Sequence, residues 1–132
     1  MKETIQTIIN KGQKNRPEQE HSLAFSIFQS FTPYLSWLLI KARFTPNAVT
    51  LTSMIAAIVG GAFLSLDTHL GYLCGAFFMH AFIALDFCDG EVARYLEKKS
   101  MSGNYLDYLG HFVMFSCLLI GLSVGIYKHN PN

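Results

Sequence analysis

Apolar residues are distributed very unevenly along this chain. Residues 1–21 are mostly polar and charged, whereas most of the segment 22–127 is apolar. Because residues 1–21 contain few large apolar side chains, they bury little surface on their own, and we expect a polar tail with a short helix at its start. The few polar positions that interrupt the rest of the chain divide it into elements.

Three long apolar segments follow one another in the later part of the chain. They are separated by a short polar turn at 67–69 and a charged connection at 97–100, and Pro46 suits the first turn of the first segment. Each segment is long enough to cross a hydrocarbon core of about 30 Å. The predicted transmembrane helices cover 48–66, 70–95 and 103–127. The pattern therefore predicts an all-α, polytopic membrane bundle of three spans over residues 45–132.

The segment 22–44, which precedes these spans, has a different character. Its apolar residues recur at helical spacing, but serines interrupt them and Pro33 would kink a helix. Aromatic side chains are frequent, which suits a helix lying in the membrane interface. These aromatic residues are Phe25, Phe28, Phe31, Tyr34 and Trp37. We predict an interfacial amphipathic helix here, and a kinked spanning helix is the alternative interpretation.

Positive charges at and beyond the ends of the spans predict the orientation of the bundle. The turn at 67–69 has no lysine or arginine, whereas five lie on the opposite side: Lys41, Arg43, Arg94, Lys98 and Lys99. By the positive-inside rule that side is cytoplasmic, together with the polar tail and the interfacial helix. The whole chain has a formal net charge of +1 at pH 7, so its electrostatics do not indicate a nucleic-acid partner.

Polar residues inside the spans are the candidates for chemistry. At i, i+3, i+4 and i+7, one face of the second span has Asp86, Asp89, Gly90 and Ala93. At i, i+4 and i+8, one face of the third span has Gly103, Asp107 and His111. Since these two spans are antiparallel neighbours, we expect both faces to meet at the cytoplasmic end. Three carboxylates would then converge beside a histidine.

This convergence of carboxylates indicates a cation and a phosphate. An aspartate inside a spanning segment costs roughly 2.5–3.5 kcal/mol to insert, so such residues usually face a partner or a watery cavity. Carboxylate oxygens suit Mg²⁺ or Mn²⁺, often shared with a substrate phosphate. Arg94, one turn beyond Gly90, can donate two hydrogen bonds to a phosphate. Together these features favour metal-assisted phosphoryl chemistry.

The spacing of these residues resembles the motif of the CDP-alcohol phosphatidyltransferase family. That pattern, D-x2-D-G-x2-A-R-x8-G-x3-D-x3-D, specifies eight positions, and seven of them match between residues 86 and 107. The matching residues are Asp86, Asp89, Gly90, Ala93, Arg94, Gly103 and Asp107. The resemblance implies an integral membrane transferase that moves a phosphatidyl group from a CDP-linked donor to an alcohol and releases CMP.

The resemblance also implies roles for single residues. The metal ligands for Mg²⁺ or Mn²⁺ would be Asp86, Asp89 and Asp107. The cytidine and diphosphate of the donor would be bound by Gly90, Ala93, Arg94 and Gly103. Asp107 and His111 would be the catalytic residues. We expect CDP-diacylglycerol as the donor, an active site on the cytoplasmic face and a homodimer in the lipid bilayer.

The chain departs from the family pattern in two respects. His111 stands where the family has its last aspartate, which is understood as the base for the alcohol. A histidine with the ordinary pKa of about 6.5 can accept a proton at neutral pH. Because it offers one nitrogen and no negative charge, it favours Mn²⁺ or a single ion. The family usually has six spans, so we expect either a fragment or an assembly in which two copies replace the missing half.

Several alternatives stay open at this stage. A catalytically impaired or truncated homologue that acts as a non-enzymatic membrane binding or interaction protein is the main alternative to an active transferase. An ion pathway fits poorly, because the carboxylates all lie at one membrane face. For His111, a structural hydrogen bond is as good an interpretation as catalysis.

Two further features of the spans carry predictions about packing. Glu91 is expected to point away from the metal face and to pair with a lysine. Two glycine pairs have the spacing of helix-packing motifs, and dimerisation through them is a hypothesis. These pairs are Gly71 with Gly75 and Gly121 with Gly125.

Overall fold

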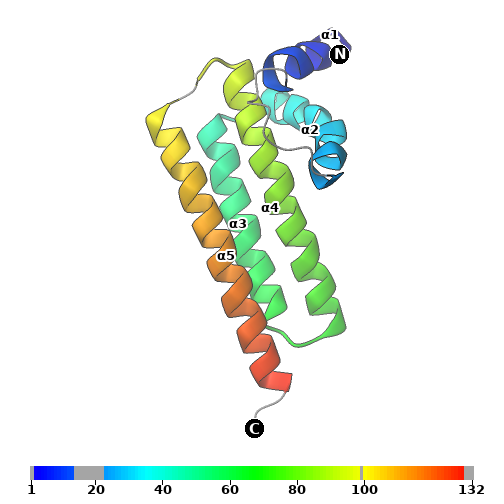
Figure 1. Cartoon of the computed structure of the whole chain (residues 1–132), viewed down its shortest axis with the longest axis vertical. Coiled ribbons are helices and arrows are strands. Elements are labelled where there is room, and N and C mark those ends of the chain that lie inside the picture. The colour runs from blue at the N-terminus through cyan, green and yellow to red at the C-terminus, as the bar shows by residue number, and fades with distance from the viewer. Residues whose placement is uncertain (1, 14–22, 99, 130–132) are drawn as a thin grey trace.

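The computed structural model describes residues 2–13, 23–98 and 100–129, and nearly all of these residues are helical (Figure 1). The elements are α1 (Lys2–Ile8), the π-helical turn η1 (Ile9–Gln13), α2 (Leu23–Lys41), α3 (Pro46–Leu64), α4 (His69–Tyr95) and α5 (Met101–His129). The described residues include no strand, so the predicted all-α class is confirmed. The predicted polar tail is helical at its start, and its remainder, 14–21, lies outside the described residues.

Capping residues explain where the three long helices begin. Thr45, Thr68 and Ser100 each accept a hydrogen bond from the backbone N–H three residues further on, at 3.3, 3.0 and 3.0 Å. Pro46 fills the first turn of α3, where its missing N–H costs nothing. The helices α3, α4 and α5 agree with the three predicted spans to within two residues at each end.

The bundle of α3, α4 and α5 has small residues inside and large apolar residues outside. All three helices are long and apolar enough to cross a membrane. In α5 the buried positions are Gly110, Gly121 and Gly125. Large exposed side chains on the same helix include Phe112, Phe115, Leu119 and Ile120. A continuous apolar surface of this kind is unfavourable in water and well solvated by lipid, so the chain is an integral membrane protein.

α3 is the central helix, because it lies between α4 and α5 and packs along both (Figure 1). Glycines allow the close approach. A Cβ on Gly61 would lie 2.7 Å from the carbonyl oxygen of Cys117, and a Cβ on Gly121 would overlap the carbonyl oxygen of Gly61. On the other side, a Cβ on Gly75 would lie 2.6 Å from Cδ2 of Leu64. The predicted packing role of the glycine pairs is confirmed within the chain, where these glycines pack against neighbouring parts of the bundle.

α2 packs its polar side against α4 and exposes its apolar side. Thr32 and Ser36 are buried, and the helix continues through Pro33 without a break. The exposed apolar side consists of Phe31, Tyr34 and Leu38. A helix on a water-soluble core has the opposite arrangement. α2 is not one of the described helices that are long and apolar enough to cross a membrane.

The N-terminal elements pack onto the end of the bundle where α4 passes into α5 (Figure 1). Ile8 is fully buried, and Lys11 Nζ lies 2.9 Å from Glu97 Oε1. The hydrogen bond and charge of Lys11 lower the pKa of Glu97, and those of Glu97 raise the pKa of Lys11. The pair therefore stabilises the fold between about pH 4.3 and 10.4, and this contribution is lost as Glu97 protonates in acid or Lys11 deprotonates in base. Because both side chains are largely exposed, the contribution is small.

We predict that Gly121→Leu destabilises the bundle by about 1–3 kcal/mol, because the larger side chain forces α5 away from α3. Ser123→Leu is the matched control, since Ser123 is exposed on the same helix. The measurement is the unfolding midpoint in detergent for both variants. Equal midpoints would contradict the glycine contact as the basis of α3–α5 packing.

Candidate active site

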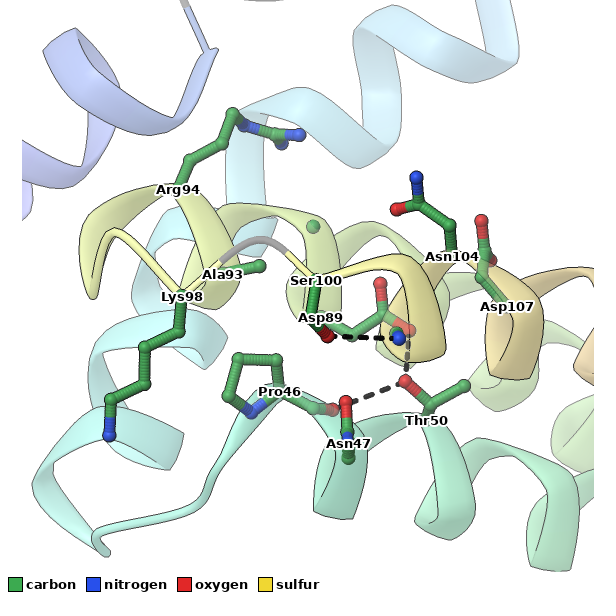
Figure 2. A pocket seen from close by; sticks show the side chains of 12 residues that line it. Pro46, Asn47, Thr50, Asp89, Ala93, Arg94, Lys98, Ser100, Asn104 and Asp107 are labelled. Carbon is green, nitrogen blue, oxygen red and sulfur yellow. Dashed lines mark hydrogen bonds between the residues drawn. The ribbon is translucent and has the colours of Figure 1, made fainter.

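A cavity of about 250 Å³ opens between the first turns of α3 and α5 and the last turns of α4 (Figure 2). Six of the seven residues that match the family motif line it: Asp89, Gly90, Ala93, Arg94, Gly103 and Asp107. The rest of the lining consists of Pro46, Asn47, Thr50, Lys98, Ser100 and Asn104. Residues of two separate helices, which the sequence predicted to face each other, thus share one cavity.

α3 contributes more to this cavity than the sequence predicted. The second and third spans were expected to be direct neighbours, but along the bundle α4 and α5 contact each other much less than either contacts α3. They do meet near the cavity, where His111 Nε2 of α5 lies 3.6 Å from Asp86 Oδ2 of α4. α3 completes the wall with Asn47 and Thr50, which the sequence prediction had missed.

Asp86, Asp107 and His111 form a compact group of possible metal ligands. One ligand atom of each lies within 4.8 Å of the other two. His111 Nδ1 lies 3.6 Å from Asp107 Oδ1. Asp107 also lines the cavity, so it connects this group with the space available to a substrate. Two carboxylates and an imidazole nitrogen are a donor set that suits a divalent cation such as Mn²⁺.

The ring of His111 has a defined orientation. Nδ1 lies 3.0 Å from the backbone carbonyl oxygen of Asp107, one helical turn earlier, and a carbonyl oxygen can only accept a hydrogen bond. In the neutral ring the proton is therefore on Nδ1, and the lone pair of Nε2 faces Asp86. Phe82 packs against the ring edge-on, with 5.9 Å between ring centroids. The structural hydrogen bond thus leaves Nε2 available to accept a proton or to bind a cation.

Asp89 is held by α3. Its side chain is almost fully buried, and Thr50 Oγ1 donates to Asp89 Oδ2 at 2.7 Å (Figure 2). Asp89 was predicted as a metal ligand with Asp86 and Asp107, but it does not belong to the compact group of ligand atoms. The role of Thr50 is hard to predict from the sequence, because a threonine in a span commonly bonds to its own helix. That contact is present too, with the carbonyl oxygen of Pro46 at 3.1 Å.

Arg94 folds back over Gly90. A Cβ on Gly90 would lie 3.1 Å from Nη1 and 3.3 Å from Nη2 of Arg94, so the glycine provides the space that the guanidinium occupies. Gly103 has a similar role at the start of α5, where a Cβ would lie 3.4 Å from Asn47 Oδ1. In the structure both glycines leave room for side chains of the cavity.

Glu91 does not line the cavity, in agreement with the prediction that it points away from the metal face. The side chain is buried, and its carboxylate accepts hydrogen bonds from Thr32 Oγ1 at 2.8 Å and Ser36 Oγ at 2.7 Å. Both donors belong to α2. This contact could not be predicted from the sequence, where the polar residues of 22–44 only interrupt an apolar helical pattern.

The fold and the site together define a membrane-embedded helical protein with a group of cation ligands and a polar cavity at one end of its bundle. The family model for CDP-alcohol phosphatidyltransferase matches residues 43–130, and the chain belongs to this family. None of the curated proteins compared with the chain matches it.

We predict that Asp86→Asn and Asp107→Asn each weaken Mn²⁺ binding about tenfold or more, because each removes a charged ligand. Titration of the purified protein with Mn²⁺, followed by electron paramagnetic resonance of the free ion, measures the affinity. Asp67→Asn is the control, since Asp67 lies in the turn at the other end of the bundle. Equal affinities of all three variants and the wild type would contradict a cation site at Asp86 and Asp107.

Proposed function

We propose that this protein transfers a substituted phosphate group, a phosphatidyl group, from a CDP-linked donor to an alcohol and releases CMP. The observation that carries the proposal is the single cavity lined by six of the seven matched motif residues. Membership of the CDP-alcohol phosphatidyltransferase family supports the same class of reaction. The seventh residue, Asp86, lies in the ligand group that shares Asp107 with the cavity.

The cavity residues divide into a donor-binding part and a reacting part. In the proposal, Gly90, Ala93, Arg94 and Gly103 bind the cytidine and diphosphate of the donor. Arg94 is suited to this role because a guanidinium pairs with phosphate oxygens through two hydrogen bonds. The polar side chains of Asn47 and Asn104 add hydrogen-bonding groups to the same lining.

His111 is the proposed proton acceptor. The alcohol oxygen forms a bond to the phosphorus that carries the lipid substituent, and the bond from that phosphorus to the CMP oxygen breaks. The hydroxyl proton passes to Nε2 of His111. The other ring nitrogen, Nδ1, keeps its own proton and donates it in the hydrogen bond to the backbone carbonyl of Asp107. Asp86 and Asp107 would hold the divalent cation, and when bound it would neutralise charge on the diphosphate.

The proposal includes a membrane orientation and partners. Lys41, Arg43, Arg94 and Lys98 lie at the end of the bundle that has the cavity, so the positive-inside rule puts the active site on the cytoplasmic face. The exposed apolar side of α2 supports a position for this helix in the interface of that leaflet. The donor would be CDP-diacylglycerol, and two copies would associate as a homodimer.

We expect the purified protein to release CMP from CDP-diacylglycerol in an acceptor-dependent way when Mn²⁺ or Mg²⁺ is present. A panel of alcohols, including alcohol phosphates, identifies the acceptor. Asp107→Ala should abolish the release, because it removes a residue of both the cavity and the ligand group. If no donor and acceptor give CMP with a folded protein that binds CDP, the non-enzymatic alternative replaces the transferase.

We predict that His111→Asp raises CMP release with Mg²⁺, because the carboxylate restores a charged oxygen ligand and the base of the family motif. His111→Ala should lower the rate about 100-fold or more, the usual contribution of a general base. The rates of the three proteins with Mg²⁺ and with Mn²⁺ test both effects. Unchanged rates in His111→Ala would assign His111 a structural role only.

The guanidinium of Arg94 occupies the space beside Gly90. Gly90→Ala should weaken CDP binding about tenfold, because its methyl group displaces the guanidinium of Arg94. The fold should tolerate the substitution, because the flexible side chain of Arg94 can move aside. Isothermal titration with CDP and the unfolding midpoint separate affinity from stability. An unchanged affinity would exclude Arg94, in its observed position, from donor binding.

A further inference from the structure

Glu91 is a buried carboxylate that the proposed reaction does not use. Only 1% of its surface is exposed, and it does not line the cavity. Its carboxylate accepts hydrogen bonds from Thr32 Oγ1 and Ser36 Oγ of α2, at 2.8 and 2.7 Å. Burial of a carboxylate is unfavourable unless such bonds replace its hydration, so this contact strongly favours one arrangement of α2 on α4.

Neighbouring contacts follow the same line between the two helices. Cys88 Sγ lies 3.7 Å from the carbonyl oxygen of Thr32, and the rings of Phe28 and Phe87 are stacked with 5.6 Å between centroids. Residues 87, 88 and 91, which make these contacts, belong to one face of α4. This face of α4 contacts α2.

Asp89, a cavity residue, lies on the other side of the same turns. Successive residues of an α-helix are rotated by about 100°, so Glu91 lies about 200° around the axis from Asp89. A contact that fixes Glu91 fixes the rotation of the helix, and with it the direction of Asp89 toward Thr50. The same turns contain Gly90 and Arg94, so their position in the cavity depends on this rotation as well.

We propose that Glu91 is a positioning residue, which fixes the cavity-lining turns of α4 through its hydrogen bonds to α2. Donor binding therefore depends on α2, although none of the α2 side chains that the structure describes lines the cavity. The identity of the ligand, CDP, rests on the proposed function, whereas the fixing of α4 rests on the α2 contacts alone. The two parts are tested by different measurements.

The variants are chosen to remove the contact from either side. Glu91→Ala removes both hydrogen bonds, Ser36→Ala removes one from the α2 side, and Glu91→Gln keeps the shape and an acceptor oxygen. Tyr72→Phe is the matched control. Tyr72 also lies on α4, and its hydroxyl donates to the carboxylate of Asp67 at 3.0 Å, at the end far from the cavity.

Amide hydrogen exchange of residues 86–95, without ligand, measures how firmly the turns are held. We expect exchange to be about tenfold or more faster in Glu91→Ala, faster by a smaller factor in Ser36→Ala, and close to wild type in Glu91→Gln and Tyr72→Phe. If Glu91→Ala fails to fold, the exchange of Ser36→Ala decides the outcome. Exchange that is unchanged in both, or equally faster in Tyr72→Phe, would overturn the proposal.

Isothermal titration with CDP in the presence of Mn²⁺ gives the functional readout. Affinity should fall about tenfold in Glu91→Ala and be restored in Glu91→Gln. Wild-type affinity in a folded Glu91→Ala variant would overturn the role of Glu91 in donor binding. If the wild-type chain itself does not bind CDP, the proposed function is contradicted, and the exchange measurements still decide whether Glu91 fixes α4.

Discussion

The close approach of α3 to both of its neighbours is the constraint on which the rest of the structure depends. Without side chains at Gly61 and Gly121, the backbones of α3 and α5 come into direct contact, and Gly75 gives α4 similar access. In lipid, where apolar side chains gain nothing from leaving the solvent, such close packing is a main source of helix association. It sets the spacing at which Thr50 of α3 can reach Asp89 of α4.

Polar groups are concentrated at one end of this bundle, and the structure gives their carboxylates defined neighbours. Asp89 accepts a hydrogen bond from Thr50, and Glu91 accepts hydrogen bonds from hydroxyl groups of α2. Asp86 lies in the group of possible metal ligands with Asp107 and His111. Each arrangement offsets part of the cost of placing a carboxylate at membrane depth. The carboxylates at this end are thus held by contacts among α2, α3, α4 and α5.

Much of this organisation could be predicted from the sequence, because spans and motif spacing are local properties. The three spans follow from apolar length, and the meeting of Asp86 with His111 follows from helical periodicity and the short connection between the spans. Contacts between distant segments could not be predicted in the same way. The bond of Thr50 to Asp89 and the inverted polarity of α2 depend on which helices pack together, and neither residue spacing nor composition encodes the central place of α3.

The pairing of Glu91 with α2 also has a consequence for the order of assembly. α2 precedes α4 in the chain and is therefore synthesised first, when its partner carboxylate does not yet exist. Until α4 has entered the bilayer, Thr32 and Ser36 have to bond to water or to their own helix, and the surface helix has no fixed place. Packing of α2 against α4 is then a late event in biogenesis, and it follows the insertion of the spans.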